Sequence, residues 1–368
     1  WPVILAFLLP ALALYGVYVI YPIAQSFRYS GFDWNGLEPL TNWVGLGNFA
    51  DAFTDPAFIQ AISHNAIIIG LSLLFQIPFA VALAVLLSRK LKGRGLFRTM
   101  FFAPYILSEV VTGVVWRQIL RPDGLLDQVL AGVGAGGVTR EWLGDPDIVL
   151  YSLFFVISWK YFGLHMVLVL AGLQLIPDEL EEAASIDGAT WWQGVRYVTL
   201  PLLGPTIRVS MFLSIIGALQ LFDLIWVTTK GGPVNASSTM ATYLIDWGFR
   251  RGQFGYASAV SVIVFGLSLV VARNKVIILE AVGSDFGGLV GFLHAFIVAE
   301  HHFYVLVQGF FFVEFDFAAH GIAFKRDDVS GNVFLLSLQQ RGNQGGRNDN
   351  GKACSHRLKL RILLWRGN

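Results

Sequence analysis

Four polar side chains that form hydrogen bonds or carry charge stand inside long apolar runs of this chain: Glu109, Lys160, Gln220 and Asp223. An ionised group in hydrocarbon costs about 2.5 to 3.5 kcal/mol on insertion scales, so such residues usually face a bundle interior or a water-filled cavity. Flat aromatic faces beside hydrogen-bonding groups are what a sugar-binding cavity requires. The residues that we expect to line a substrate path are Glu109, Trp116, Trp159, Lys160, Tyr161, Gln220 and Asp223.

A structural role is the alternative for each of these residues. Lys160 and Asp223 can pair with each other, or with a partner subunit, and hold helices together. The tryptophans can belong to the aromatic belts at the two membrane interfaces. The sequence leaves both interpretations open.

Other chemistry is not expected from the motifs. Gly346, Gly351 and Lys352 have the spacing of a phosphate loop, but Ala353 replaces the hydroxyl residue that holds Mg²⁺, and no strand is expected before them. The histidines have no metal-ligand spacing, and no nucleophile motif is present. We therefore expect no catalytic residue, no metal site and no cofactor bound by this chain, which is not an enzyme.

The composition predicts an integral membrane protein. Hydrophobic residues make up 55% of the 368 residues and charged residues only 14%, and the mean hydropathy is +0.60. Soluble domains carry about 25% charged residues, so lipid is the expected solvent. With a net charge of +1 and little clustered basic surface, no nucleic-acid partner is expected.

Six apolar runs approach the length of about 20 residues that a helix needs to cross a bilayer. The first is longer than the core of a signal peptide, and the chain begins at Trp1 rather than Met, so we expect further residues before it. The predicted fold class is all-α, a polytopic membrane helical bundle with six transmembrane helices. The runs cover residues 3–23, 65–87, 97–120, 148–175, 207–228 and 254–272.

Orientation depends on a basic cluster between the second and third runs. Lys and Arg favour the cytoplasmic side, whereas acidic residues contribute little to this rule. Alternation of the spans then places the loop at residues 176–205 on the cytoplasmic side as well, although that loop is acidic. The cluster consists of Arg89, Lys90, Lys92, Arg94 and Arg98.

Local signals within residues 176–205 predict two short helices. Pro177 suits a first helical turn, and Gly188 can take the left-handed conformation that ends a helix. A second helix from about Thr190 is expected to stop at Pro201. The small side chains of residues 183–184 allow another protein to approach closely. An amphipathic connector lying on the headgroups is the alternative.

The run Glu182-Ala183-Ala184-Ser185-Ile186-Asp187-Gly188-Ala189, followed by Leu200-Pro201, resembles the EAA loop of permease subunits in binding-protein-dependent ABC importers. Val198 stands where that family usually has isoleucine. Residues 186–189 are similar to the version in the carbohydrate-type, MalF-like group. Three further segments agree in order, at residues 43–49, 103–105 and 229–233, so the resemblance covers about residues 3–272.

The resemblance implies a multi-pass permease subunit of a bacterial or archaeal inner membrane that imports a sugar or oligosaccharide. It implies three partners: a second homologous permease, a dimer of ABC ATPases that uses ATP and Mg, and an extracytoplasmic solute-binding protein. It places a cytoplasmic coupling helix between spans four and five. The residues that it assigns to ATPase coupling are Glu181, Glu182, Ala183, Ala184, Asp187, Gly188, Leu200 and Pro201.

Two alternatives remain for the function. The motifs report coupling and not cargo, so an importer of glycerol phosphate, amino acids or another small solute is the first. A stand-alone secondary transporter or channel, which needs neither an ATPase nor an EAA loop, is the second.

The resemblance ends near residue 272. We expect a permease domain over residues 1–275 and an atypical, poorly packed extension without a transport role over residues 276–368, as an altered reading frame would produce. A seventh span over residues 287–312 is one alternative, and a metal site that begins at Glu300, His301 and His302 is another.

Overall fold

The computed structural model describes residues 2–89, 92–280, 323–326 and 333–336. It divides into two compact units, Trp1–Phe303 and Tyr304–Asn368, and each is described by itself. The expected domain boundary after residue 275 stays a prediction. The alternatives at residues 287–312 and 300–302 and the phosphate-loop spacing at residues 346–352 lie outside the described residues.

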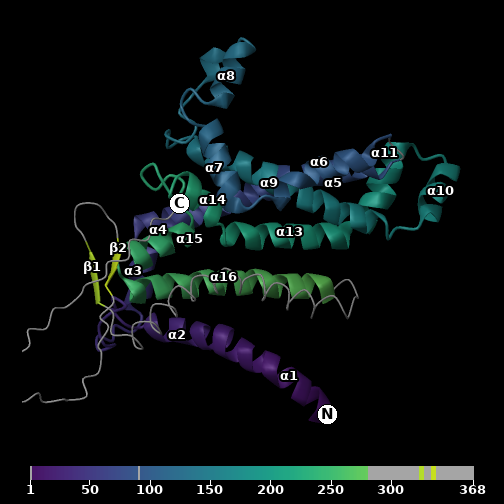
Figure 1. Ribbon diagram of the computed structural model, residues 1–368. Coiled ribbons are helices and arrows are strands. Elements are labelled where there is room, and N and C mark those ends of the chain that lie inside the picture. The colour runs from purple at the N-terminus through teal and green to yellow at the C-terminus, as the bar shows by residue number, and fades with distance from the viewer. Residues whose placement is uncertain (1, 90–91, 281–322, 327–332, 337–368) are drawn as a thin grey trace, which may run out of the picture. The chain divides into compact units, whose positions relative to one another are not determined.

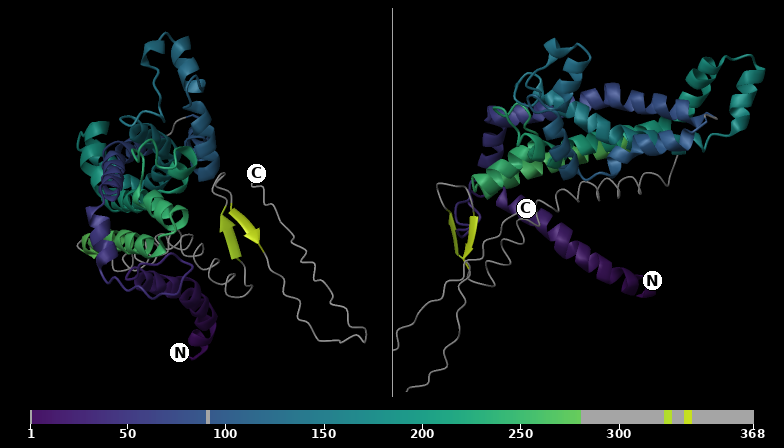
Figure 2. Two further views of the ribbon diagram at one scale, coloured as in Figure 1. Left: turned by 90° about the vertical axis from the view of Figure 1, so that its left-hand side faces the viewer. Right: turned by 45° about the horizontal axis from the view of Figure 1, so that its top comes forward.

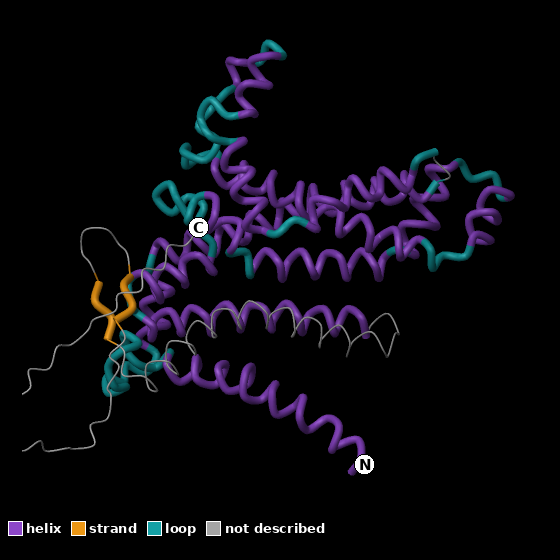
Figure 3. The backbone as a smooth tube through the Cα atoms, viewed as in Figure 1, coloured by secondary structure: helices purple, strands orange, loops and turns teal. Residues whose placement is uncertain are grey.

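The described elements of the first unit are helices, and the predicted all-α membrane bundle is confirmed there (Figures 1 and 3). The α-helices are α1 (Pro2–Tyr15), α2 (Tyr21–Tyr29), α3 (Gly47–Thr54), α4 (Pro56–Leu71), α5 (Ile77–Ser88), α6 (Arg94–Ile106), α7 (Glu109–Ile119), α8 (Leu125–Gly132), α9 (Val149–Leu173), α10 (Asp178–Ile186), α11 (Trp191–Gly194), α12 (Leu200–Leu202), α13 (Gly204–Leu219), α14 (Asp223–Thr228), α15 (Met240–Ile245) and α16 (Phe254–Glu280).

Short segments of tighter or wider helix join several of these elements. Wider, π-helical turns often occur where a helix serves a function, because they rotate the side chains that follow. The π-helical turns are Gly16–Ile20, Ser72–Gln76, Val195–Thr199 and Asp246–Arg250, and a 3₁₀ turn covers Gly136–Val138.

The second unit contains two short antiparallel strands within its described residues, β1 (Ala323–Arg326) and β2 (Val333–Leu336) (Figure 2). Ala323 pairs with Leu336, and Arg326 pairs with Val333. Aromatic and β-branched residues such as Phe324 and Val333 favour extended backbone. The all-α expectation therefore does not extend to these eight residues of the extension.

Four helical stretches are long and apolar enough to cross a membrane without interruption: Leu8–Tyr29, Pro56–Ser88, Val149–Leu173 and Phe254–Arg273. The third predicted span is a bent pair, whereas the fifth, residues 207–228, overlaps only the second half of another bent pair, which ends at Leu219 before the separate helix α14. Arg94–Ile106 and Glu109–Ile119 meet at 97°, and Trp191–Leu202 and Gly204–Leu219 meet at 66°. The count of six spans is reached when each bent pair is one span.

The sharper bend separates α6 from α7. Leu107 and Ser108 have extended backbone, with ψ of 140° and 151°, and Pro104 in the last turn of α6 has no N–H to donate. The Ser108 side chain then caps α7 by accepting from the Val111 N–H at 3.2 Å. The third span is therefore divided at Leu107–Ser108.

The second bend lies beyond the position that the sequence suggests. Thr190 begins a helix with a capping box that includes Gln193, as expected. The helix then continues through Pro201 to Leu202, so the expected stop at Pro201 is wrong. A π-helical turn at Val195–Thr199 ends two residues before this proline and fits a residue that lacks an N–H, and the bend follows between Leu202 and Gly204.

Contacts between loops agree with the predicted alternation of sides. The Arg89 guanidinium lies over the Trp191 ring, 4.6 Å from its centroid, so the basic loop and the loop of α10 share one end of the bundle. At the other end, the Gly255 N–H donates to the Trp34 carbonyl at 3.0 Å. Asn65 donates to the Ala218 carbonyl at 2.6 Å and accepts from the Met240 N–H at 2.9 Å. This end of the second span is thereby tied to the fifth span and to α15.

Helix α9 is central to the bundle and packs against α5, α6 and α13 (Figure 1). Its Val149, Leu153 and Val156 belong to one buried cluster, and its Met166 and Val169 belong to a second. In lipid, close packing and small residues replace the hydrophobic effect as the source of helix association. The positions at which two backbones meet should therefore tolerate no larger side chain.

Gly163 of α9 is the tightest such contact with α6. A Cβ atom at Gly163 would lie 2.1 Å from the Phe101 carbonyl oxygen, which is backbone and cannot rotate away. We expect Gly163→Ala to force the two helices apart and to cost about 1 to 3 kcal/mol of stability. Thermal unfolding of the detergent-purified protein measures the loss.

Gly70→Ala is the matched control for this prediction. Gly70 lies on α4, and a Cβ atom there meets nothing within 4 Å. The midpoint of thermal unfolding of the Gly70→Ala variant should stay at or above that of the unchanged protein, because alanine is a better helix former than glycine. Equal midpoints for the two variants would contradict the close contact.

Candidate functional site

Helix α10 stands at one end of the bundle, joined to α9 by residues 174–177 (Figure 1). It ends in a Schellman motif. Gly188 has φ of +85°, its N–H donates to the Ser185 carbonyl at 3.1 Å, and the Ala189 N–H donates to the Ala184 carbonyl at 3.0 Å. The predicted glycine stop is therefore present in the structure.

No residue of α10 is buried. Glu182 and Ala183 are exposed, and Ala184 is half-buried. Three acidic residues occupy the first turn, which favours them through the helix dipole: Asp178, Glu179 and Glu181. The helix presents a backbone with small side chains and an acidic border.

Apolar side chains on and beside α10 are exposed too, and they are not among the residues assigned to coupling. Ile186 is 86% exposed and Leu175 is 83% exposed. Trp192 is 59% exposed. Large apolar side chains that are exposed close together in one loop favour an interaction surface. These residues could have been found from the sequence, because large apolar side chains are unusual in a polar loop.

The remaining coupling residues, Leu200 and Pro201, lie in the helical segment Trp191–Leu202 that returns from the loop to the bundle. The Thr199 hydroxyl donates to the Glu181 carboxylate at 3.1 Å, so the two short helices are joined. Leu200 and Pro201 form α12 with Leu202, directly before the 66° bend. The geometry brings this set together in one loop, whereas their role in coupling stays a prediction.

A cavity of about 430 Å³ lies among the second, third, fourth and fifth spans. Three of the seven expected path residues line it: Glu109, Tyr161 and Gln220. The other lining residues were not expected, because serine, glutamine and leucine in a span carry no distinctive signal. The lining residues outside the expected set are Ile68, Ser72, Gln76, Tyr105, Ile157, Leu164, His165, Leu168, Leu213, Ser214, Gly217, Ala218, Leu221 and Phe222.

Buried polar side chains in this cavity have no hydrogen-bond partner among the described residues. Gln76 is only 4% exposed and Ser72 only 2%. The amide of Gln220 and the hydroxyl of Ser214 are also free within that part of the chain. The π-helical turn Ser72–Gln76 places its first and last residues on the cavity wall. These side chains line the cavity, where a ligand or water can supply the missing hydrogen bonds.

Glu109 and Tyr161 face each other across the break in the third span. The Tyr161 hydroxyl donates to the Glu109 carboxylate. Glu109 is the first residue of α7, where the helix dipole favours a negative charge. This contact gives the cavity wall one fixed carboxylate.

Lys160 lies outside the cavity lining. Its ammonium donates to the Leu107 carbonyl, and the residue is 2% exposed. Lys160 and Asp223 form no ion pair with each other in the described part of the chain. The residue stabilises the break in the third span instead.

The other expected path residues also stand beside the cavity and not in its wall. Trp116 and Trp159 contact each other edge to face, with ring centroids 5.3 Å apart. Asp223 begins α14 and lies in its first turn. Their role in a substrate path stays a prediction.

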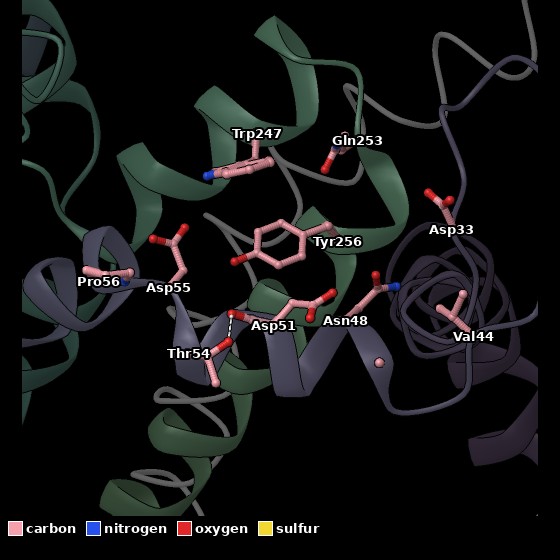
Figure 4. A pocket seen from close by; sticks show the side chains of 11 residues that line it. Asp33, Val44, Asn48, Asp51, Thr54, Asp55, Pro56, Trp247, Gln253 and Tyr256 are labelled. Atoms are coloured by element: carbon pink, nitrogen blue, oxygen red, sulfur yellow. Dashed lines mark hydrogen bonds between the residues drawn. The ribbon is translucent and has the colours of Figure 1, made fainter.

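A second cavity, of about 610 Å³, lies near the beginnings of α4 and α16 and was not expected from the sequence. The Trp247 ring lies over the Tyr256 ring, with centroids 4.8 Å apart, and the carboxylates of Asp55 and Asp51 lie beside and below the tyrosine (Figure 4). The Tyr243 hydroxyl donates to the Asp55 carboxylate. Burial is the main cause, and this hydrogen bond the second, that raises the pKa of Tyr243 above its ordinary value. Asp51 and Asp55, from the segment between the first two spans, contribute to this hollow.

No group of three or more potential metal ligands occurs among the residues that the structure describes. The buried histidines have other contacts. His64 Nδ1 lies 2.9 Å from the Ser238 carbonyl oxygen, and His165 Nδ1 lies 2.7 Å from the Ser210 hydroxyl. These contacts anchor helices.

Comparison with known proteins decides the family. The profile of the binding-protein-dependent transport system inner membrane component matches residues 76–280. The chain belongs to this family. The resemblance expected from the EAA loop is thereby confirmed, and with it a permease of the inner membrane.

Relatives extend over most of this permease. A probable ABC transporter permease of Pyrococcus horikoshii is 34% identical over 73% of this chain and 93% of its own length. The lactose transport permease LacF of Rhizobium radiobacter is 34% identical, covering 70% of this chain and 87% of its own. The trehalose/maltose permease MalF of Thermococcus litoralis is 31% identical, covering 71% and 88%.

A solved structure supports the fold. A bacterial ABC transporter that imports the acidic polysaccharide alginate superposes with a TM-score of 0.68, at 24% identity, over 77% of this chain and 96% of its own. Family membership makes the chain a permease component of an ABC transporter, which fits the expectation of a non-enzyme. The stand-alone secondary transporter is not supported.

We predict that Lys160→Met lowers stability. The substitution keeps the length of the side chain but removes the donor to the Leu107 carbonyl, which would then be unpaired at a helix break. We expect a loss of about 1 to 3 kcal/mol, seen as a lower midpoint of thermal unfolding in detergent. Lys92→Met, at an exposed position, is the control; a similar midpoint for both variants would show that the contact does not stabilise the break.

Proposed function

We propose that this permease subunit moves a sugar or oligosaccharide into the cell, driven by ATP hydrolysis in a partner subunit. The observation that carries the proposal is the cavity whose lining amides and hydroxyls lack partners in the described chain. Hydroxyl groups of a sugar would satisfy them, and the rings of Tyr105, Tyr161 and Phe222 offer apolar faces to the sugar ring. The sugar names of LacF and MalF support this cargo class.

The loop of α10 is proposed as the contact with the ATPase. An exposed helix with small residues at its centre allows close approach, while exposed Ile186 and Trp192 supply apolar contact area. Glu181 and Glu182 can pair with basic groups of the partner. Closure of an ATPase dimer would then move α10, and with it α9 and α13, between inward-facing and outward-facing arrangements.

The partners follow from the same proposal. They are a second homologous permease, an ABC ATPase dimer and an extracytoplasmic solute-binding protein. The description of the family as binding-protein-dependent supports the last of these. ATP and Mg would be bound by the ATPase, and no cofactor by this chain.

We predict that Glu182→Lys or Gly188→Pro abolishes uptake while membrane insertion is retained. Charge reversal at an interface costs several kcal/mol, enough for more than about a tenfold loss. Proline cannot adopt the φ of +85° at Gly188, so the Schellman turn would be lost. Sugar uptake and co-purification of the ATPase are measured together.

Glu38→Lys is the control for charge reversal, because Glu38 is exposed in the loop after the first span. It should keep both uptake and ATPase binding. Full transport by the two loop variants would refute coupling through α10.

We also predict that Gln220→Ala changes cargo selectivity. Loss of one amide that binds a sugar hydroxyl should weaken the preferred cargo by about tenfold relative to its competitors. Uptake of competing sugars by the reconstituted importer is the measurement. Gln60→Ala, at an exposed position on α4, is the control; an unchanged ranking with a lower protein level would favour a structural role for Gln220.

A further inference from the structure

The cavity wall carries an uneven set of charges. Among the described residues that line it, Glu109 is the one acidic group, and neither lysine nor arginine is present. The remaining lining groups are hydroxyls, amides, aromatic rings, aliphatic side chains and one imidazole. An anion in this cavity would meet a carboxylate and no ammonium or guanidinium.

One ammonium attracts the Glu109 carboxylate but lies outside the cavity lining, so a ligand in the cavity meets the carboxylate and not this cation. Lys160 is buried, and its ammonium is held by the Leu107 carbonyl. The imidazole of His165 has its Nδ1 engaged with Ser210. Lys160 is therefore not placed to receive an anionic ligand, and His165 has one ring nitrogen already engaged.

Glu109 also occupies the position that would otherwise attract an anion. Helix N-termini bind anions through free backbone N–H groups and the helix dipole. At α7 the Ser108 side chain already accepts from the Val111 N–H, and the carboxylate of Glu109 stands at the first helical position. The Tyr161 hydroxyl fixes that carboxylate. The broken span therefore presents negative charge to the cavity.

We propose that this permease selects uncharged saccharides and rejects anionic ones such as uronates, with Glu109 as the specificity-determining residue. The inference rests on the proposed function and narrows its cargo class. Coulomb repulsion excludes an anion, whereas the free amides and hydroxyls bind a neutral sugar. The solved alginate transporter, which imports an acidic polysaccharide, shares the fold with this chain at 24% identity.

Charged thiol reagents test the cavity without knowledge of the cargo. The reporter is Ser214→Cys in a Cys354→Ser background, which removes the single native cysteine. Its rates with a cationic trimethylammonium-ethyl and an anionic sulfonatoethyl methanethiosulfonate are measured in the assembled transporter at pH 8, where an ordinary imidazole is neutral. Each rate is divided by that of the same reagent with a small thiol in solution.

The ratio of the normalised cationic rate to the normalised anionic rate should exceed one. Glu109→Gln should reduce this ratio by about tenfold, since one charge acts on the two reagents with opposite sign. Glutamine keeps the acceptor for Tyr161, so the fold is retained. Glu38→Gln removes an exposed charge elsewhere and should leave the ratio unchanged. Gly217→Cys, where a Cβ atom meets nothing within 4 Å, provides a second reporter on the same wall. A ratio near one at both reporters, or a ratio that Glu109→Gln does not move, would overturn the inference.

Transport separates this inference from the proposed function. The reconstituted importer is offered maltose, lactose, cellobiose and trehalose, each beside a derivative oxidised to the uronate at C6. At least one neutral sugar should enter more than about tenfold faster than its uronate, and Glu109→Gln should narrow that difference. Equal rates of entry for a sugar and its uronate would overturn charge selection but not the proposed function. Entry of none of these saccharides, with another solute transported, would overturn the proposed function, and the reagent ratio would still decide the charge of the cavity.

Discussion

Hydrocarbon offers no hydrogen-bond partner to a peptide group, so a helix can be interrupted inside a membrane only where the protein supplies one. The break between α6 and α7 meets this condition. Lys160 donates to the Leu107 carbonyl, and the Ser108 side chain accepts from the Val111 N–H. Lys160 lowers the hydropathy of the fourth span, but its hydrogen bond to Leu107 allows the third span to turn by 97°.

The turn has a consequence for the cavity. A straight third span would place residue 109 on the next helical position along one axis, whereas the break makes Glu109 the first residue of a new helix. There the Tyr161 hydroxyl reaches its carboxylate. The break thus converts one acidic residue of an apolar run into part of a polar wall. Opposite it, the π-helical turn in the second span contributes Ser72 and Gln76.

Much of this arrangement could be predicted from the sequence. The glycine stop at Gly188 and the capping box at Thr190 are local features, which depend on residues within one or two turns. The division of the expected path residues could not be predicted in the same way. Lys160 and Tyr161 are neighbours in sequence, yet a helix turns by about 100° per residue, so one points to the break and the other to the cavity. Periodicity in a run that is apolar on all sides carries no information on which face is which.

Helix α9 connects the cavity with the loop of α10. It contributes Tyr161 and His165 to the cavity wall, and only residues 174–177 separate its last turn from α10. Because Gly163 brings its backbone against that of α6, a shift of α9 cannot be absorbed by loose side chains at this contact. On the proposed function, a displacement of α10 would then reach the break at Leu107 and the carboxylate of Glu109 together, since Lys160 and Tyr161 are carried by the same helix. Coupling and cargo selection would share one rigid element.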